Sequence, residues 1–176
     1  FVDELSSNRR IGAAVTETLE RLAQRDEEPM AALRTGISML SAEDPERGLV
    51  PTDSETIRRT GRRLTAKIPT VLAAYDRFRR GERPVEPSAK LGHAENFLYM
   101  LTGSEPDDVA AETFDTALTL HADHGLNAST FTAMTVASTH ADLYSAVTAG
   151  VGALSGPLHG GANQDVMETL LEVDES

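Results

Sequence analysis

Apolar residues recur at intervals of three and four along most of the chain, which is the spacing of one face of an α-helix. The pattern is clear at Ile11, Val15, Leu19 and Leu22, and polar residues occupy the positions between them. Pro29 is suited to begin the next helix, because a proline in the first turn has no N–H to leave unpaired. The alternation of apolar and polar residues that marks a strand never persists. The pattern therefore predicts an all-α protein.

Two segments rich in proline and glycine, 42–52 and 81–87, interrupt the helical pattern and are predicted to be loops. Between them, one long helix is predicted over 53–80. Pro69 is expected to kink this helix or to divide it in two, because proline cannot donate a backbone hydrogen bond. Shorter helices are predicted at 94–101, 107–122, 129–139, 141–154 and 164–173.

The composition excludes several classes of function. The chain has 176 residues and no cysteine, which excludes thiolate nucleophiles, cysteine-ligated zinc and iron–sulfur clusters. Acidic residues number 28 against 16 lysines and arginines, for a net charge of −12. This charge disfavours nucleic acid and anionic membranes as partners. Only Lys67 and Lys90 are lysines. An acidic, lysine-poor surface is what we expect of a protein from a halophilic organism; the alternative explanation of the arginine bias is a G+C-rich genome.

The chain shows no signal peptide and no membrane span. Its first ten residues carry charges of both signs. The longest uncharged run, 143–164, contains five glycines and is too polar to span a membrane. Together with the absence of cysteine, this indicates a cytoplasmic protein. Because the chain begins without methionine in charged, helix-like sequence, we expect it to be part of a longer protein.

All five histidines lie in the second half of the chain, two of them in the phrase His121-Ala-Asp-His124. Gly125 is predicted to end the helix that carries this phrase. Histidines three residues apart share a face of a helix, so they could bind a metal ion together with Asp123. The alternative is a capped helix end whose histidines have only structural roles. The spacing leaves both interpretations open.

His159 lies in a second phrase, Ser155-Gly-Pro-Leu-His-Gly-Gly-Ala-Asn163. The glycines on both sides allow positive φ angles and a close approach by a ligand. The helix predicted at 164–173 would direct its free N–H groups toward this turn and favour a neutral imidazole, which can donate a hydrogen bond to a carbonyl group. The alternative is a turn histidine without a catalytic role.

The two phrases together, in this order, resemble the citrate synthase family. Lys67-Ile-Pro-Thr70 and Glu95-Asn-Phe-Leu-Tyr-Met-Leu101 are similar to the family as well. The resemblance implies a multi-helix large domain, a homodimer, and an acyltransferase that condenses acetyl-CoA with oxaloacetate and water to citrate and CoA. It implies no metal ion or other cofactor, since acetyl-CoA is a substrate.

The resemblance also implies roles for single residues. His159 matches the family histidine that hydrogen-bonds the acetyl-CoA thioester oxygen and stabilises the enol(ate). His124 matches a histidine that binds oxaloacetate, and Asn127 lies in the same substrate-lining segment. His93 and His140 match no functional position.

Several family segments have no counterpart in this chain: those with the second catalytic histidine, the aspartate base and the arginines that hold the carboxylates. Residues 1–176 are therefore expected to be part of the large domain, with the small domain and an N-terminal segment missing, and to be inactive alone. The arginines between 58 and 80 are expected to lie on solvated helix surfaces. The alternatives are a 2-methylcitrate synthase that uses propionyl-CoA, a non-catalytic metal-binding module using His121 and His124, and a purely structural helical scaffold.

Overall fold

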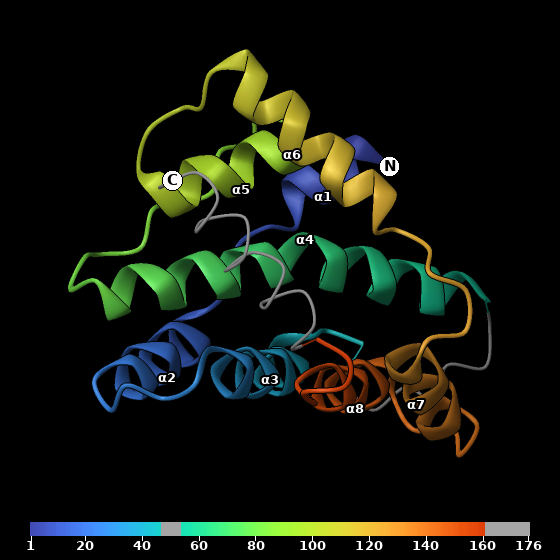
Figure 1. Ribbon diagram of the computed structural model, residues 1–176. Coiled ribbons are helices and arrows are strands. Elements are labelled where there is room, and N and C mark those ends of the chain that lie inside the picture. The colour runs from blue at the N-terminus through green and yellow to red at the C-terminus, as the bar shows by residue number, and fades with distance from the viewer. Residues whose placement is uncertain (47–53, 161–176) are drawn as a thin grey trace.

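The computed structural model describes residues 1–46 and 54–160, and within these ranges it contains helices and turns but no strand (Figure 1). The all-α prediction is confirmed. The elements are α1 (Val2–Ser7), α2 (Ala13–Ala23), α3 (Pro29–Leu40), the 3₁₀ helix η1 (Ser41–Glu43), α4 (Ser54–Arg79), α5 (His93–Thr102), α6 (Asp108–Leu120), α7 (Ala128–Ala137) and α8 (Leu143–Leu154). The helix predicted at 164–173 lies outside the described residues. No helix within the described ranges is long and apolar enough to cross a membrane.

Local sequence signals place several of the helix ends. Pro29 is the first residue of α3, and the Glu28 side chain accepts a hydrogen bond from the Ala31 N–H at 2.8 Å. Asp107 and Asp142 cap α6 and α8 in the same way. These side chains satisfy N–H groups that the first turn of a helix leaves unpaired.

Helix α4 runs through Pro69 as one continuous element, so the helix is not divided there. A proline inside a helix removes one backbone hydrogen bond and crowds the preceding turn. Burial of the apolar stripe offsets this cost, because Leu64, Val71 and Tyr75 on both sides of Pro69 are almost fully buried. Tertiary packing thus outweighs the local preference.

The other helices pack around α4. In Figure 1, α2, α3 and α8 lie along one side of α4, and α1 and α5 lie along the other, with α6 beyond α5. Helix α7 is not among the helices that cover α4. It packs mainly against α8. Helix α4 therefore has helices on two sides, and α7 lies at the periphery.

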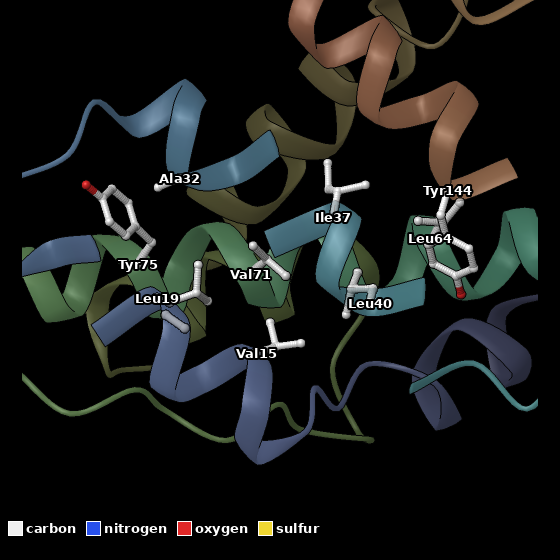
Figure 2. Packing of buried hydrophobic residues seen from close by; sticks show 10 residues of the cluster. Val15, Leu19, Ala32, Ile37, Leu40, Leu64, Val71, Tyr75 and Tyr144 are labelled. Carbon is white, nitrogen blue, oxygen red and sulfur yellow. The ribbon is translucent and has the colours of Figure 1, made fainter. Parts of the chain in front are cut away.

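The hydrophobic core lies between α4 and the layer formed by α2, α3 and α8. Its buried members include residues of all four helices (Figure 2). They are Val15, Leu19, Ala32, Ile37, Leu40, Leu64, Val71, Ala74, Tyr75 and Tyr144. Helix α3 crosses α4 closely at Gly36, where an added Cβ would lie 2.5 Å from Cγ1 of Val71. A larger residue at position 36 would displace the Val71 side chain or the helices themselves.

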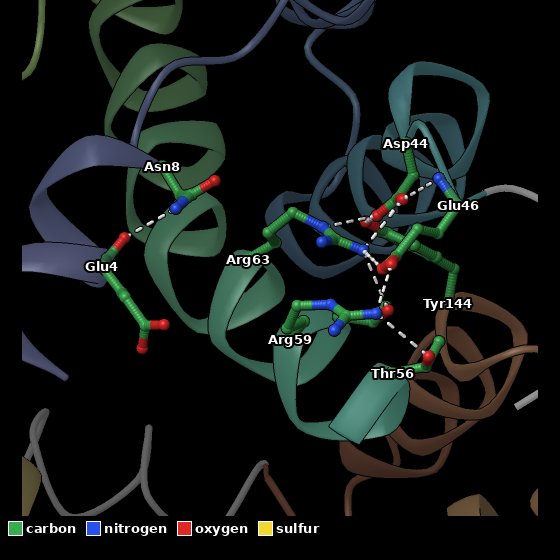
Figure 3. Close-up of polar contacts among 9 residues, drawn as sticks. Glu4, Asn8, Asp44, Glu46, Thr56, Arg59, Arg63 and Tyr144 are labelled. Atoms are coloured by element: carbon green, nitrogen blue, oxygen red, sulfur yellow. Dashed lines mark hydrogen bonds and ion pairs between the residues drawn. The ribbon is translucent and has the colours of Figure 1, made fainter. Parts of the chain in front are cut away.

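A partly buried cluster of charged and polar side chains joins the end of η1 to α4 and α8 (Figure 3). The Arg63 guanidinium donates two hydrogen bonds to Asp44, both at 2.9 Å, and one to Glu46 at 2.6 Å. Arg59 donates to the other oxygen of Glu46 at 2.7 Å. The Tyr144 hydroxyl, from α8, donates to Asp44. The Arg63 side chain is only 14% exposed, so the expectation of a solvated surface arginine is wrong for this residue.

The partners of Asp44 keep its carboxyl group ionised. Burial acts to raise the pKa of Asp44, but hydrogen bonds from Tyr144, the Glu46 N–H and Arg63, with the charge of Arg63, outweigh it and lower the pKa. Burial and the nearby Asp44 carboxylate raise the pKa of Tyr144. Asp44 is thus the charged acceptor and Tyr144 the neutral donor.

A second buried arginine fixes the N-terminal segment. Arg9 is 2% exposed, and its guanidinium donates to the carbonyl oxygens of Ser88 and Gly92 in the loop before α5. The Thr70 hydroxyl of α4 donates to the Arg9 carbonyl oxygen at 2.8 Å. Burial lowers the pKa of Arg9. Arg9 thereby connects the start of the chain to α4 and to the loop that leads into α5.

We predict that Tyr144→Phe lowers the free energy of unfolding by about 1–3 kcal/mol, because the buried Asp44 carboxylate loses a donor. Urea denaturation measures this change. Tyr99→Phe is the matched control, since the Tyr99 hydroxyl has no hydrogen-bond partner in the described part of the chain, and it should change stability by less than about 0.5 kcal/mol. Equal losses in the two variants would contradict a stabilising role for the Asp44 contact.

Candidate active site

The candidate site lies where the start of α7 meets the chain that leaves α8. The two helices pack closely against each other. The connection between them is short and contains His140 in the left-handed conformation, with φ of 62°. A short connection between packed helices makes them antiparallel. The beginning of α7, near Asn127, is therefore brought to the end of α8, near His159.

Two backbone hydrogen bonds shape the loop after α8. The Gly160 N–H donates to the Leu154 carbonyl oxygen, and the His159 N–H donates to the Gly156 carbonyl oxygen, both at 2.9 Å. A Cβ at position 160 would lie 2.2 Å from the Leu154 oxygen, so this turn requires glycine. Positive φ is not the reason, because neither Gly156 nor Gly160 has one. The turn directs His159 back toward α7.

The ring of His159 contacts the first turn of α7. Its Nε2 atom accepts a hydrogen bond from the Ser129 N–H at 3.3 Å and lies 3.1 Å from the Ser129 hydroxyl oxygen. A backbone N–H can only donate, so this contact favours the ring tautomer that leaves Nε2 unprotonated and places the proton on Nδ1. The helix expected to favour this state, 164–173, lies outside the described residues, and the donor seen is the start of α7.

Asn127 is the N-cap of α7. Its side-chain oxygen accepts from the Thr130 N–H at 2.8 Å and from the Ser129 hydroxyl at 2.7 Å. The first of these bonds is the usual cap contact. The second orients the hydroxyl that lies beside the His159 ring. Asn127 is therefore connected to His159 through Ser129, and its amide nitrogen remains able to donate.

The structure separates His121 from His124. Helix α6 ends at Leu120, and the His121 ring contacts the Ala117 carbonyl oxygen at 2.7 Å, as a residue at a helix C-terminus. Gly125 has a positive φ of 61° in the turn that follows, so the prediction that it ends the helix is wrong by several residues. His121 and His124 do not share a helix face. No group of three histidine, aspartate or glutamate side chains in 1–46 and 54–160 is placed to hold a metal ion.

His124 is exposed and lies in the turn before Asn127. The structure thus brings Asn127 and His159 together through Ser129, and it places His124 in the segment that leads into the same helix start. Sequence reasoning missed Ser129. Its place in the first turn after an Asn cap is a local signal, but its contact with His159 joins residues 30 positions apart, which no local pattern indicates.

We predict that Asn127→Ala lowers the free energy of unfolding by about 1 kcal/mol, the usual cost of losing an N-cap. Asn127→Asp retains an oxygen acceptor for the Thr130 N–H and the Ser129 hydroxyl, and it should lose clearly less. Thermal or urea unfolding of both variants makes the comparison. If the aspartate variant loses as much as the alanine variant, the cap contact is not what Asn127 contributes.

Comparisons with known proteins give one family throughout. A family model described as citrate synthase, C-terminal domain, matches residues 1–176. The citrate synthase of Haloferax volcanii is 57% identical over 100% of this chain and 47% of its own length. A 2-methylcitrate synthase of Mycobacterium tuberculosis is 41% identical over 99% of this chain and 43% of its own length. The chain spans about half the length of the curated relatives it matches.

Solved structures agree with this fold. Citrate synthase from Pyrobaculum aerophilum superimposes with a TM-score of 0.89 and 40% identity, over 97% of this chain and 44% of that chain. A ternary complex of citrate synthase from Thermoplasma acidophilum with carboxymethyl coenzyme A and oxaloacetate gives a TM-score of 0.82 and 25% identity, over 90% of this chain and 41% of that chain. With the family model matching its whole length, the chain belongs to the citrate synthase family.

Proposed function

We propose that this chain is part of the helical large domain of a citrate synthase, which condenses acetyl-CoA with oxaloacetate and water to citrate and CoA. The observation that carries the proposal is the placement of His159. Its Nε2 accepts from the Ser129 N–H, and its Nδ1 has no hydrogen-bond partner within residues 1–46 and 54–160. The small domain and the catalytic base are proposed to come from sequence outside this chain.

The neutral imidazole suits the chemistry of a thioester enol(ate). When a base removes a proton from the acetyl methyl group, negative charge develops on the thioester oxygen. The Nδ1–H of His159 donates a hydrogen bond to this oxygen and stabilises the charge, which is the task of an oxyanion hole. The enol carbon then forms the new C–C bond with the oxaloacetate carbonyl carbon, and water cleaves the thioester to release CoA.

His124 and Asn127 are proposed to bind oxaloacetate. The positive dipole end of α7 lies beside these residues, and such a helix start favours a carboxylate. The exposed His124 ring and the Asn127 amide nitrogen can both donate to a carboxylate oxygen. The geometry does not support a metal-binding module using His121 and His124, because the two residues share no helix face. We propose no metal and no other cofactor.

We predict that His159→Ala lowers kcat of the enzyme expressed from its complete gene by about 10²–10³-fold, because the oxyanion loses its donor. Release of CoA from acetyl-CoA in the presence of oxaloacetate measures the rate. His140→Asn is the control, since it changes a histidine in the α7–α8 connection and asparagine tolerates positive φ. An unchanged rate in His159→Ala would exclude the assigned role.

The acyl donor of the proposed reaction is acetyl-CoA, and propionyl-CoA is the alternative. Relatives of similar identity include both citrate synthases and 2-methylcitrate synthases. A 2-methylcitrate synthase uses propionyl-CoA, which is therefore the alternative substrate. One methylene group separates the two acyl groups, and a pocket distinguishes them by about 1–3 kcal/mol. In the same assay, a higher kcat/KM for acetyl-CoA supports the proposal, and a higher value for propionyl-CoA supports the alternative.

We further propose a homodimer in the cytoplasm. Helix α7 is apolar, yet no residue of it is buried. Phe131 is 60% and Met134 is 57% exposed. Exposed apolar side chains on one helix favour a protein partner, and a second copy related by a two-fold axis is the commonest one.

The surface charge gives a separate proposal, that the protein comes from a halophilic organism. Its net charge is −12, and the Haloferax volcanii enzyme is 57% identical to it. We predict that the melting temperature rises when KCl is increased from about 0.1 M to about 2 M, because salt screens repulsion among the surface carboxylates. Differential scanning calorimetry measures the change. A melting temperature that is independent of KCl would contradict the proposal.

A further inference from the structure

Gly150 lies on the face of α8 that packs against the first turn of α7, and it is buried. A Cβ placed on Gly150 would lie 3.2 Å from the Ser129 carbonyl oxygen and 3.5 Å from the Cβ of Ala133. The first of these distances is shorter than an ordinary carbon–oxygen contact. The absence of a side chain at position 150 therefore lets the backbone of Ser129 approach α8 as closely as it does.

The same residue, Ser129, holds the His159 ring. Its N–H donates to Nε2 at 3.3 Å, which is already at the long end for a hydrogen bond. The Ser129 carbonyl group, on the opposite side of the residue, is the group that faces Gly150. Because both groups belong to one residue in a regular helix turn, moving the carbonyl away from α8 moves the N–H as well.

His159 follows α8 and not α7. The loop that carries it is bonded to the last turn of α8 through the Gly160 N–H and the Leu154 carbonyl oxygen. The donor and the acceptor of the Ser129–His159 hydrogen bond thus belong to two different helices. Their separation depends on the spacing of α7 and α8, and Gly150 is where the first turn of α7 approaches α8 closely.

We propose that Gly150 is a positioning residue for His159. By keeping α7 close to α8, it holds the Ser129 N–H within hydrogen-bonding distance of Nε2 and so keeps the imidazole proton on Nδ1. A side chain at position 150 separates the two helices, weakens this hydrogen bond and frees Nε2 to take up the proton. The catalytic consequence of this inference rests on the proposed function, whereas its effect on the ring does not.

The chain offers a matched control in the same helix. A Cβ on Gly152 would lie 3.8 Å from Cδ of Arg34, which is an ordinary contact with the far part of a flexible side chain. Replacing either glycine gives α8 the same gain in helix propensity. In the Ala and Leu variants at position 150, the new side chain therefore contacts the α7 backbone. In the same variants at position 152 it does not.

The test uses the protein expressed from its complete gene and two measurements. Nitrogen-15 NMR of the His159 ring reports which ring nitrogen carries the proton. We expect Nε2 to be unprotonated in the wild type and in both Gly152 variants. Gly150→Leu should transfer the proton to Nε2 and lower kcat by about tenfold without a comparable change in KM, since a small misplacement of a catalytic group has an effect of this size. Gly150→Ala should give a smaller shift in the same direction.

Circular dichroism first establishes that each variant is folded. If Gly150→Leu does not fold, the NMR shift of Gly150→Ala decides. An unchanged ring signal in the folded Gly150 variants, or an equal change in the Gly152 variants, overturns the inference. If the wild type releases no CoA, the proposed function fails, but a proton transfer confined to the Gly150 variants still supports the positioning role.

Discussion

Helix α4 has to be buried over much of its length, and the rest of the fold is arranged to meet that requirement. Its stripe of apolar and small residues includes Leu64, Val71, Ala74 and Tyr75, all almost fully buried. A single neighbour cannot cover so long a stripe, so α2, α3 and α8 cover one side and α1 and α5 the other. The same burial keeps the helix continuous through Pro69, because apolar burial along the stripe is larger than the cost of one missing hydrogen bond.

Polar contacts then fix the positions of elements that apolar packing alone leaves adjustable. The Asp44 carboxylate, with donors from Arg63 and Tyr144, connects η1, α4 and α8 at one point. A buried carboxylate with directional partners accepts only one arrangement of those elements, since losing a partner leaves a charge unpaired. Because α8 leads into the loop with His159, the cluster also fixes the position of the helix that supplies this histidine. Arg9 has the same role for the N-terminal segment, with backbone carbonyls in place of a carboxylate.

The candidate site follows from two helix ends that meet. Helix α8 supplies the glycine turn with His159, and α7 supplies its capped first turn with Asn127 and Ser129. The helix start donates N–H groups, and the imidazole accepts one of them, so backbone geometry favours the tautomer of His159 with its proton on Nδ1. This arrangement suits a group that has to donate a hydrogen bond to a developing oxyanion while remaining neutral.

The sequence by itself determined the helices and the family. The three-and-four spacing of apolar residues is a local property, so it predicted the helices of the described ranges from α2 onward, with errors mainly at their ends, as at His121 and Gly125. The two histidine phrases are also local, and they indicated the family and singled out His159. Only the tertiary structure decided that Arg9 is buried and Arg63 largely so, that Ser129 contacts His159, and that Gly150 lies against the α7 backbone. These contacts join residues far apart in the chain, and their existence depends on how whole helices pack, which no local pattern of residues encodes.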